Sequence, residues 1–144
     1  MKKICLMLLS VACMSVSFAQ SPTFKKDASD IAHAIKHKCL SGGYKLLINY
    51  NTTATASFYV KPGTNYLLYY IYDILPKKVV NFDAHLMTAD SAMQRKYTNA
   101  PEDILVKGSA KVALLDFKTP AFEKTRLPVK VNANPKAIIY VYYK

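Results

Sequence analysis

Residues 54–73, ATASFYVKPGTNYLLYYIYD, predict a β-hairpin at the centre of the fold. Pro62-Gly63 is typical of a type II turn, because proline presets φ at the first corner and glycine supplies a positive φ at the second. Before the turn, apolar and polar residues alternate with the period of a half-buried strand. After it, 66–72 is apolar or aromatic at every position. We therefore expect a central strand that is covered by protein on both faces.

Upstream of the hairpin, 21–41 predicts one amphipathic helix. Pro22 suits its first turn and Gly42-Gly43 its C-terminal stop. The charged residues and histidines lie away from the apolar stripe. The stripe consists of Ala28, Ile31, Ile35 and Cys39, and Phe24 and Leu40 widen it. We expect this stripe to pack on a sheet face or to close one end of a sandwich.

Downstream of the helix, the sequence keeps the period of β-structure to its end. Polar residues at 51–53 and 88–101 predict connections, Pro128 places its strand at an edge, and Asn134-Pro135 predicts a turn. The expected strands are 44–50, 54–60, 66–72, 80–86, 103–107, 110–117, 127–131 and 136–143. Seven to eight short strands predict an antiparallel, jelly-roll-like β-sandwich over 44–144, with the helix of 20–43 packed on it.

The first residues predict export. Lys2 and Lys3 precede an apolar run at 4–12, and Ser17-Phe18-Ala19 provides small residues for cleavage, so 1–19 is expected to be a signal peptide. The run is shorter than the roughly 20 residues that a membrane-spanning helix needs. The alternative is lipidation at Cys13. The predicted location is the periplasm, the cell surface or the extracellular space.

Charge is the main guide to a partner. The chain has 20 basic and 9 acidic residues, a formal charge of +11, and loss of Lys2 and Lys3 leaves +9. Such a balance favours an acidic partner, either a glycan or a protein. The scarcity of arginine argues against nucleic acid. Cys39 is the only cysteine after the predicted cleavage site, so no internal disulfide is expected there.

A family resemblance rests on three segments: SFYVKPGTNYLLYYIYD, VNFDAHLMTAD and AIIYVYY. Together they resemble the bacterial pre-peptidase C-terminal domain, a secreted β-sandwich attached to extracellular enzymes. Gly63 and Tyr66 match the family's turn, and Asp83 matches the first acid of its D-x-D pattern. His85 replaces the second acid, and calcium prefers oxygen ligands. The resemblance implies a non-catalytic binding or accessory module.

Few residues in the sequence form an arrangement that could bind a metal or act in catalysis. His33 and His37 have the i, i+4 spacing of metal ligands, but Cys39 lies on the apolar stripe, so solvent-facing histidines are expected. Asp83 and His85 share one strand face with Asn81, which is typical of an exposed sheet face. We expect neither bound zinc nor calcium, and no cofactor.

The sequence is rich in tyrosine, with eleven tyrosines and no tryptophan. Tyrosine pairs well across strands, so a structural role is favoured over an aromatic binding surface. The leading function is an exported, non-catalytic binding module for an acidic glycan or protein. The alternatives are a small hydrolase that depends on a metal or on His and Cys, and an inhibitor or immunity-type protein that plugs a partner. The predicted partner contacts are Tyr97, Lys77, Lys78, Asp83 and His85.

Overall fold

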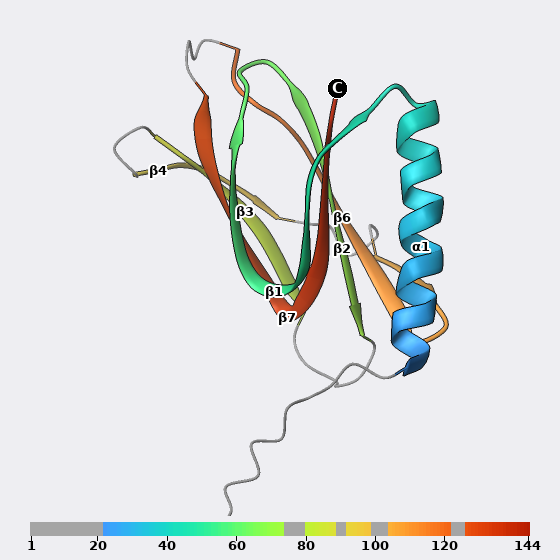
Figure 1. Ribbon diagram of the computed structural model, residues 1–144. Helices are drawn as coiled ribbons and strands as arrows, with labels where there is room; N and C mark the ends of the chain where they lie inside the picture. Colours follow the sequence, from blue (N-terminus) through green and yellow to red (C-terminus); the bar gives the residue numbers. More distant parts are fainter. Residues whose placement is uncertain (1–21, 74–79, 89–91, 99–103, 122–125) are drawn as a thin grey trace, which may run out of the picture.

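The computed structural model describes residues 22–73, 80–88, 92–98, 104–121 and 126–144 (Figure 1). The predicted signal peptide and Lys77-Lys78 lie outside the described residues. Helix α1 (Pro22–Ser41) precedes the strands. These are β1 (Lys45–Val60), β2 (Asn65–Asp73), β3 (Asn81–Met87), β4 (Met93–Thr98), β5 (Ile104–Lys107), β6 (Ala110–Lys118) and β7 (Leu127–Tyr143). All of them join one antiparallel sheet in the order β4-β3-β7-β2-β6-β5, with β1 paired to β7.

The sheet is bent along its two longest strands, β1 and β7. The first half of β7 pairs with β3 and its second half with β2, while β1 follows β7 through both halves. Register shifts in β1 between Tyr50 and Thr55 lie at the bend, where irregular pairing turns a strand. Figure 1 shows β1 and β7 folding together into a U. The described strands thus form a single, nearly barrel-shaped sheet instead of the predicted two-sheet sandwich.

The predicted hairpin is wrong in its pairing. β1 and β2 both pair with β7 and not with each other, so the connection 61–64 passes between the two arms of the U. Gly63 has the expected positive φ, 65°. Buried Thr119 holds the connection: its hydroxyl donates to the Lys61 carbonyl at 2.6 Å and accepts from the Thr64 N–H at 3.0 Å.

Three predicted interruptions are strand instead. Residues 51–53 continue β1, and polar side chains suit this part of the strand because they are exposed or half-exposed there. The predicted loop at 88–101 contains β4, again a polar edge strand. Pro128 and Asn134-Pro135 lie within β7, which is central. Its ladder with β3 reaches only Val129, so the missing N–H of Pro128 interrupts no pairing with β3.

The core confirms the predicted faces of the helix and of the central strand. Between the arms of the U lie Tyr66, Leu68, Tyr70 and Tyr72 of β2, together with the apolar residues of β3 and β7. The alternate β2 residues Tyr69 and Ile71 face α1, whose buried side chains are Phe24, Ala28, Ile31, Ile35 and Cys39. Leu40 is 51% exposed and does not widen the stripe.

Both ends of α1 are fastened to the sheet. Near the first turn, the Asp27 carboxylate accepts hydrogen bonds from the Ser109 N–H at 2.8 Å and the Ser109 hydroxyl at 2.9 Å. Beyond the last turn, Lys144 Nζ donates to the Gly42 carbonyl at 2.8 Å and lies over the Tyr44 ring. The helix is therefore held at a fixed position over β2, β6 and the second half of β7.

Replacing Asp27 should loosen the first of these attachments. Asp27→Ala removes the acceptor of the Ser109 N–H and hydroxyl, so we expect the free energy of unfolding to fall by about 1–3 kcal/mol. Asp30→Ala is the matched control, because Asp30 is exposed on the same helix. Urea denaturation of both variants measures the difference. Equal stabilities would show that the β5–β6 turn does not anchor the helix.

Candidate functional site

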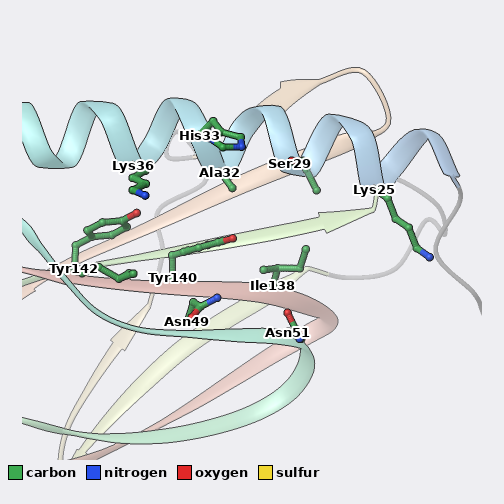
Figure 2. Close-up of a pocket in the computed structure, with 12 residues that line it drawn as sticks. Lys25, Ser29, Ala32, His33, Lys36, Asn49, Asn51, Ile138, Tyr140 and Tyr142 are labelled. Carbon is green, nitrogen blue, oxygen red and sulfur yellow. The ribbon is translucent and has the colours of Figure 1, made fainter.

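A groove lies between α1 and the β1–β7 edge of the sheet, with a volume of about 410 Å³. Figure 2 shows helix side chains on one side of it, and tyrosine and asparagine side chains on the other. The helix contributes Lys25, Ala28, Ser29, Ala32, His33 and Lys36 to its lining, and the sheet contributes Leu46, Asn49, Asn51, Ile138, Tyr140 and Tyr142. The volume lies within the range of small-ligand sites.

The helix side follows from residue spacing. Lys25, Ser29, His33 and Lys36 recur every three or four residues and so share one helix face. This face borders the buried stripe, where the small side chains of Ala28 and Ala32 leave room above the sheet. Lys25 and Lys36 are eleven residues apart, about 16 Å along the helix axis. The groove therefore carries a positive charge at two well-separated points.

The sheet side is built by cross-strand neighbours. Asn49 of β1 is paired with Tyr140 of β7, and Leu46 with Tyr142. Tyr142 is almost wholly buried and meets Tyr69 edge to face, with 6.1 Å between ring centroids. Burial raises the pKa of Tyr142 to about 12, with smaller contributions from Cys39 and Tyr140. Its hydroxyl is thus neutral at physiological pH and can donate a hydrogen bond.

The ionisable side chains that line the groove include basic groups and no described carboxylate. Two lysines and one histidine line it, and none of its described lining residues is an aspartate or glutamate. The two asparagine amides and two tyrosine hydroxyls add neutral hydrogen-bonding groups. Such a lining can bind carboxylates while it also contacts apolar parts of a ligand.

A second, smaller hollow of about 140 Å³ lies on the other face of β1. Its lining again contains two cations, Lys61 and Arg126, and no described carboxylate. The other lining residues are Leu47, Tyr59, Tyr66 and Tyr143. Lys61 Nζ lies 5.9 Å from the centroid of the Tyr143 ring. Both faces of this part of β1 are therefore bordered by positive charge.

The predicted contacts Asp83 and His85 form a polar cluster on β3, away from the groove. The expected exposed sheet face is wrong at Asp83, which is only 5% exposed. Its carboxylate accepts a hydrogen bond from Asn132 Nδ2 at 2.8 Å and lies 3.2 Å from Lys96 Nζ. His85 Nε2 lies 3.2 Å from the same carboxylate. Burial acts to raise the pKa of Asp83, but the hydrogen bonds from Asn132 and Lys96 and the nearby His85 outweigh it, so the pKa is lowered.

This cluster gives a pH prediction. Because the pKa of Asp83 is lower in the folded protein, its ionised form stabilises the fold above the unfolded pKa of about 4, and this contribution disappears as the pH falls through the folded value. We expect Asp83→Asn to lower the free energy of unfolding by about 1–3 kcal/mol at neutral pH. Below neutral pH, the free energy of unfolding of the variant should fall less steeply than that of the wild type. Asp30→Asn is the exposed control. Identical acid limbs for Asp83→Asn and wild type, in denaturation curves between pH 2 and 7, would contradict this role.

The other predicted site residues are also separate from the groove. Tyr97 lies in β4 and not in a loop; its ring stacks on Phe117 with 4.4 Å between centroids, and its hydroxyl donates to the Lys118 carbonyl at 3.5 Å. It joins the two arms of the sheet, which is a structural role. Partner contact by Tyr97, Asp83 and His85 stays a prediction, as it does for Lys77 and Lys78, which lie outside the described residues.

Cys39, His33 and His37 are placed as expected. Both histidines are exposed, whereas Cys39 is 1% exposed with Sγ 3.7 Å from the Tyr69 hydroxyl. Burial raises the pKa of the Cys39 thiol, which disfavours the thiolate. Within the described residues, no three His, Cys, Asp or Glu side chains gather in a metal-binding arrangement. Among the described helices, none has the length and apolar character needed to span a membrane.

Sequence reasoning did not identify the groove. Its one local signal is the polar face at Lys25, Ser29, His33 and Lys36, which looks like any solvated helix face. The sheet side depends on pairing between β1 and β7, which are far apart in the chain. No family model, curated protein or solved structure matches the chain. The groove is therefore the feature of the described residues that bears most directly on function.

Proposed function

We propose that the protein is an exported, non-catalytic binding module whose helix–sheet groove takes an acidic partner, a glycan or a protein. The observation that carries the proposal is the lining of the groove: Lys25, Lys36 and His33 with no described carboxylate. The net charge of +9 expected after loss of Lys2 and Lys3 adds a long-range attraction for the same kind of partner.

The groove has rigid walls, which favours binding. α1 is fastened at both ends, and the Tyr142 ring is packed against Tyr69, so the lining is preorganised. Asn49 and Asn51 present amides that both donate and accept hydrogen bonds, as sugar hydroxyls and peptide groups require. The resemblance to pre-peptidase C-terminal domains points to the same class of accessory module.

The hydrolase alternative has weaker support from the groove. Ser29 and His33 are one helical turn apart, but no described carboxylate lines the groove to orient the imidazole. Cys39 of α1 is buried between the helix and the sheet, and His85 belongs to the Asp83 cluster on β3. These placements favour binding over acid–base or nucleophilic chemistry.

The test is a titration of the mature protein with two acidic probes, oligoglutamate and oligogalacturonate, and with neutral dextran as control. We expect at least one acidic probe to bind at low salt, with chemical-shift changes at Lys25, Lys36, Asn49 and Tyr140, and no binding of dextran. Binding of dextran equal to that of the acidic probes, or no binding of either acidic probe, would contradict the proposal.

A further inference from the structure

The first part of β1, residues 45–50, is an open sheet edge beside the groove. It pairs with 139–143 of β7 on one side only, with a register shift at Leu47 between Leu46 and Ile48, and no described strand lies on its other side. Three consecutive apolar residues in it are exposed: Leu46 (44%), Leu47 (39%) and Ile48 (36%). Open edges of this kind present unpaired N–H and C=O groups to another chain.

The two basic hollows lie on opposite faces of this edge. Leu46 lines the large groove with Lys25 and Lys36, whereas Leu47 lines the small hollow with Lys61 and Arg126. Successive residues of a strand point to opposite faces, so a strand added at this edge would also send its side chains alternately to the two faces. Acidic side chains on either face would then meet lysine or arginine.

We propose that the acidic partner is a protein, and that an extended acidic segment of it adds to the edge of β1 at 45–50 as a further strand of the sheet. This inference rests on the proposed binding of an acidic partner and names its chemical class. The main chain of the segment pairs with β1, and its carboxylates reach Lys25 and Lys36 on one face and Lys61 and Arg126 on the other.

The length of the site suits such a segment. About 16 Å separates Lys25 from Lys36 along the helix, which corresponds to roughly five residues of extended chain. That length is close to the six residues 45–50 that form the open edge. A second copy of this chain is less suitable, because antiparallel pairing of two β1 edges keeps the same face of each copy together and would bring the cations of each hollow near those of the same hollow in the other copy.

The first test uses backbone methylation of the probe. Oligoglutamate of about ten residues is compared with the same peptide N-methylated at alternate residues and at every residue. Alternate methylation leaves one edge of the peptide able to pair, whereas full methylation blocks both edges at the same charge. We expect the alternately methylated peptide to bind within about threefold of the unmodified one, and the fully methylated peptide to bind about tenfold or more weakly. Equal binding of all three would overturn strand addition.

The second test locates the peptide. On binding of unmodified oligoglutamate, we expect amide hydrogen exchange at 45–50 to slow, and both Lys25→Glu/Lys36→Glu and Lys61→Glu/Arg126→Glu to weaken binding. The inference would be overturned, and the ligand placed in the groove alone, by either of two results. One is unchanged amide exchange at 45–50, and the other is weaker binding by Lys25→Glu/Lys36→Glu but not by Lys61→Glu/Arg126→Glu. Protection of the same amides in a dimer of the free protein would assign the edge to a second copy and would also overturn it.

The two proposals fail in different ways. Binding of oligogalacturonate without binding of oligoglutamate would keep the acidic-ligand function and overturn the peptide inference. No binding of either acidic probe at low salt would overturn both.

Discussion

Ile31→Asp is expected to lower the free energy of unfolding by about 3–5 kcal/mol. Ile31 is 6% exposed and packs in the cluster between α1 and β2. An aspartate there loses the apolar contacts of isoleucine and places a carboxylate where none of the buried cluster residues is cationic. Total stabilities of small domains are about 5–15 kcal/mol, so the expected loss is a large fraction.

His37→Ala is the control for this experiment, since His37 is exposed on the same helix and its loss should be near neutral. Thermal and urea denaturation of the two variants beside the wild type measure the effect. An Ile31→Asp variant as stable as the wild type would show that α1 is a detached tail. The groove, which needs α1 as one wall, would then not exist in solution.

The second large effect is expected on binding. Lys25→Glu/Lys36→Glu places two like charges against an acidic ligand, and we expect the affinity for the acidic probe that binds to fall about tenfold to a hundredfold. Lys118→Glu/Lys130→Glu is the matched control: it changes the net charge by the same amount at exposed residues that do not line the groove. Isothermal titration calorimetry measures both variants.

The comparison separates local recognition from bulk charge. An equal fall in affinity for the groove pair and the control pair would show that the protein attracts acidic ligands through its net charge alone. If neither double variant weakened binding, these lysines would have no role in recognition of the ligand.

Local features of the fold could be predicted from the sequence, because they depend on residues that are close in the chain. The spacing of Ala28, Ile31, Ile35 and Cys39 fixes the buried face of the helix in any context. The unbroken apolar run of β2 likewise requires cover on both faces, and the structure supplies the helix on one and the inner core on the other.

Pairing and bending could not be predicted, because they depend on distant residues. Pro128 is typical of an edge strand and Asn134-Pro135 of a turn, yet β7 is central and continues through both, because β1 bends alongside it and pairs on both sides of the bend. Polar Asn51 and the polar β4 residues resemble loops, yet edge strands accept polar side chains. The groove combines the face of a helix with β7 residues about a hundred positions later, so no local pattern reveals it.

The salt dependence of binding is the most direct test of the central claim that exposed lysines recognise an acidic partner. The dissociation constant for the acidic probe that binds, oligoglutamate or oligogalacturonate, is measured at about 0.02 M and about 0.5 M sodium chloride, on either side of the ionic strength at which the Debye length is about 10 Å. If lysines recognise the ligand, we expect the affinity to be about tenfold or more weaker at the higher salt. Equal affinity at the two concentrations would contradict it and would assign the positive charge to solubility.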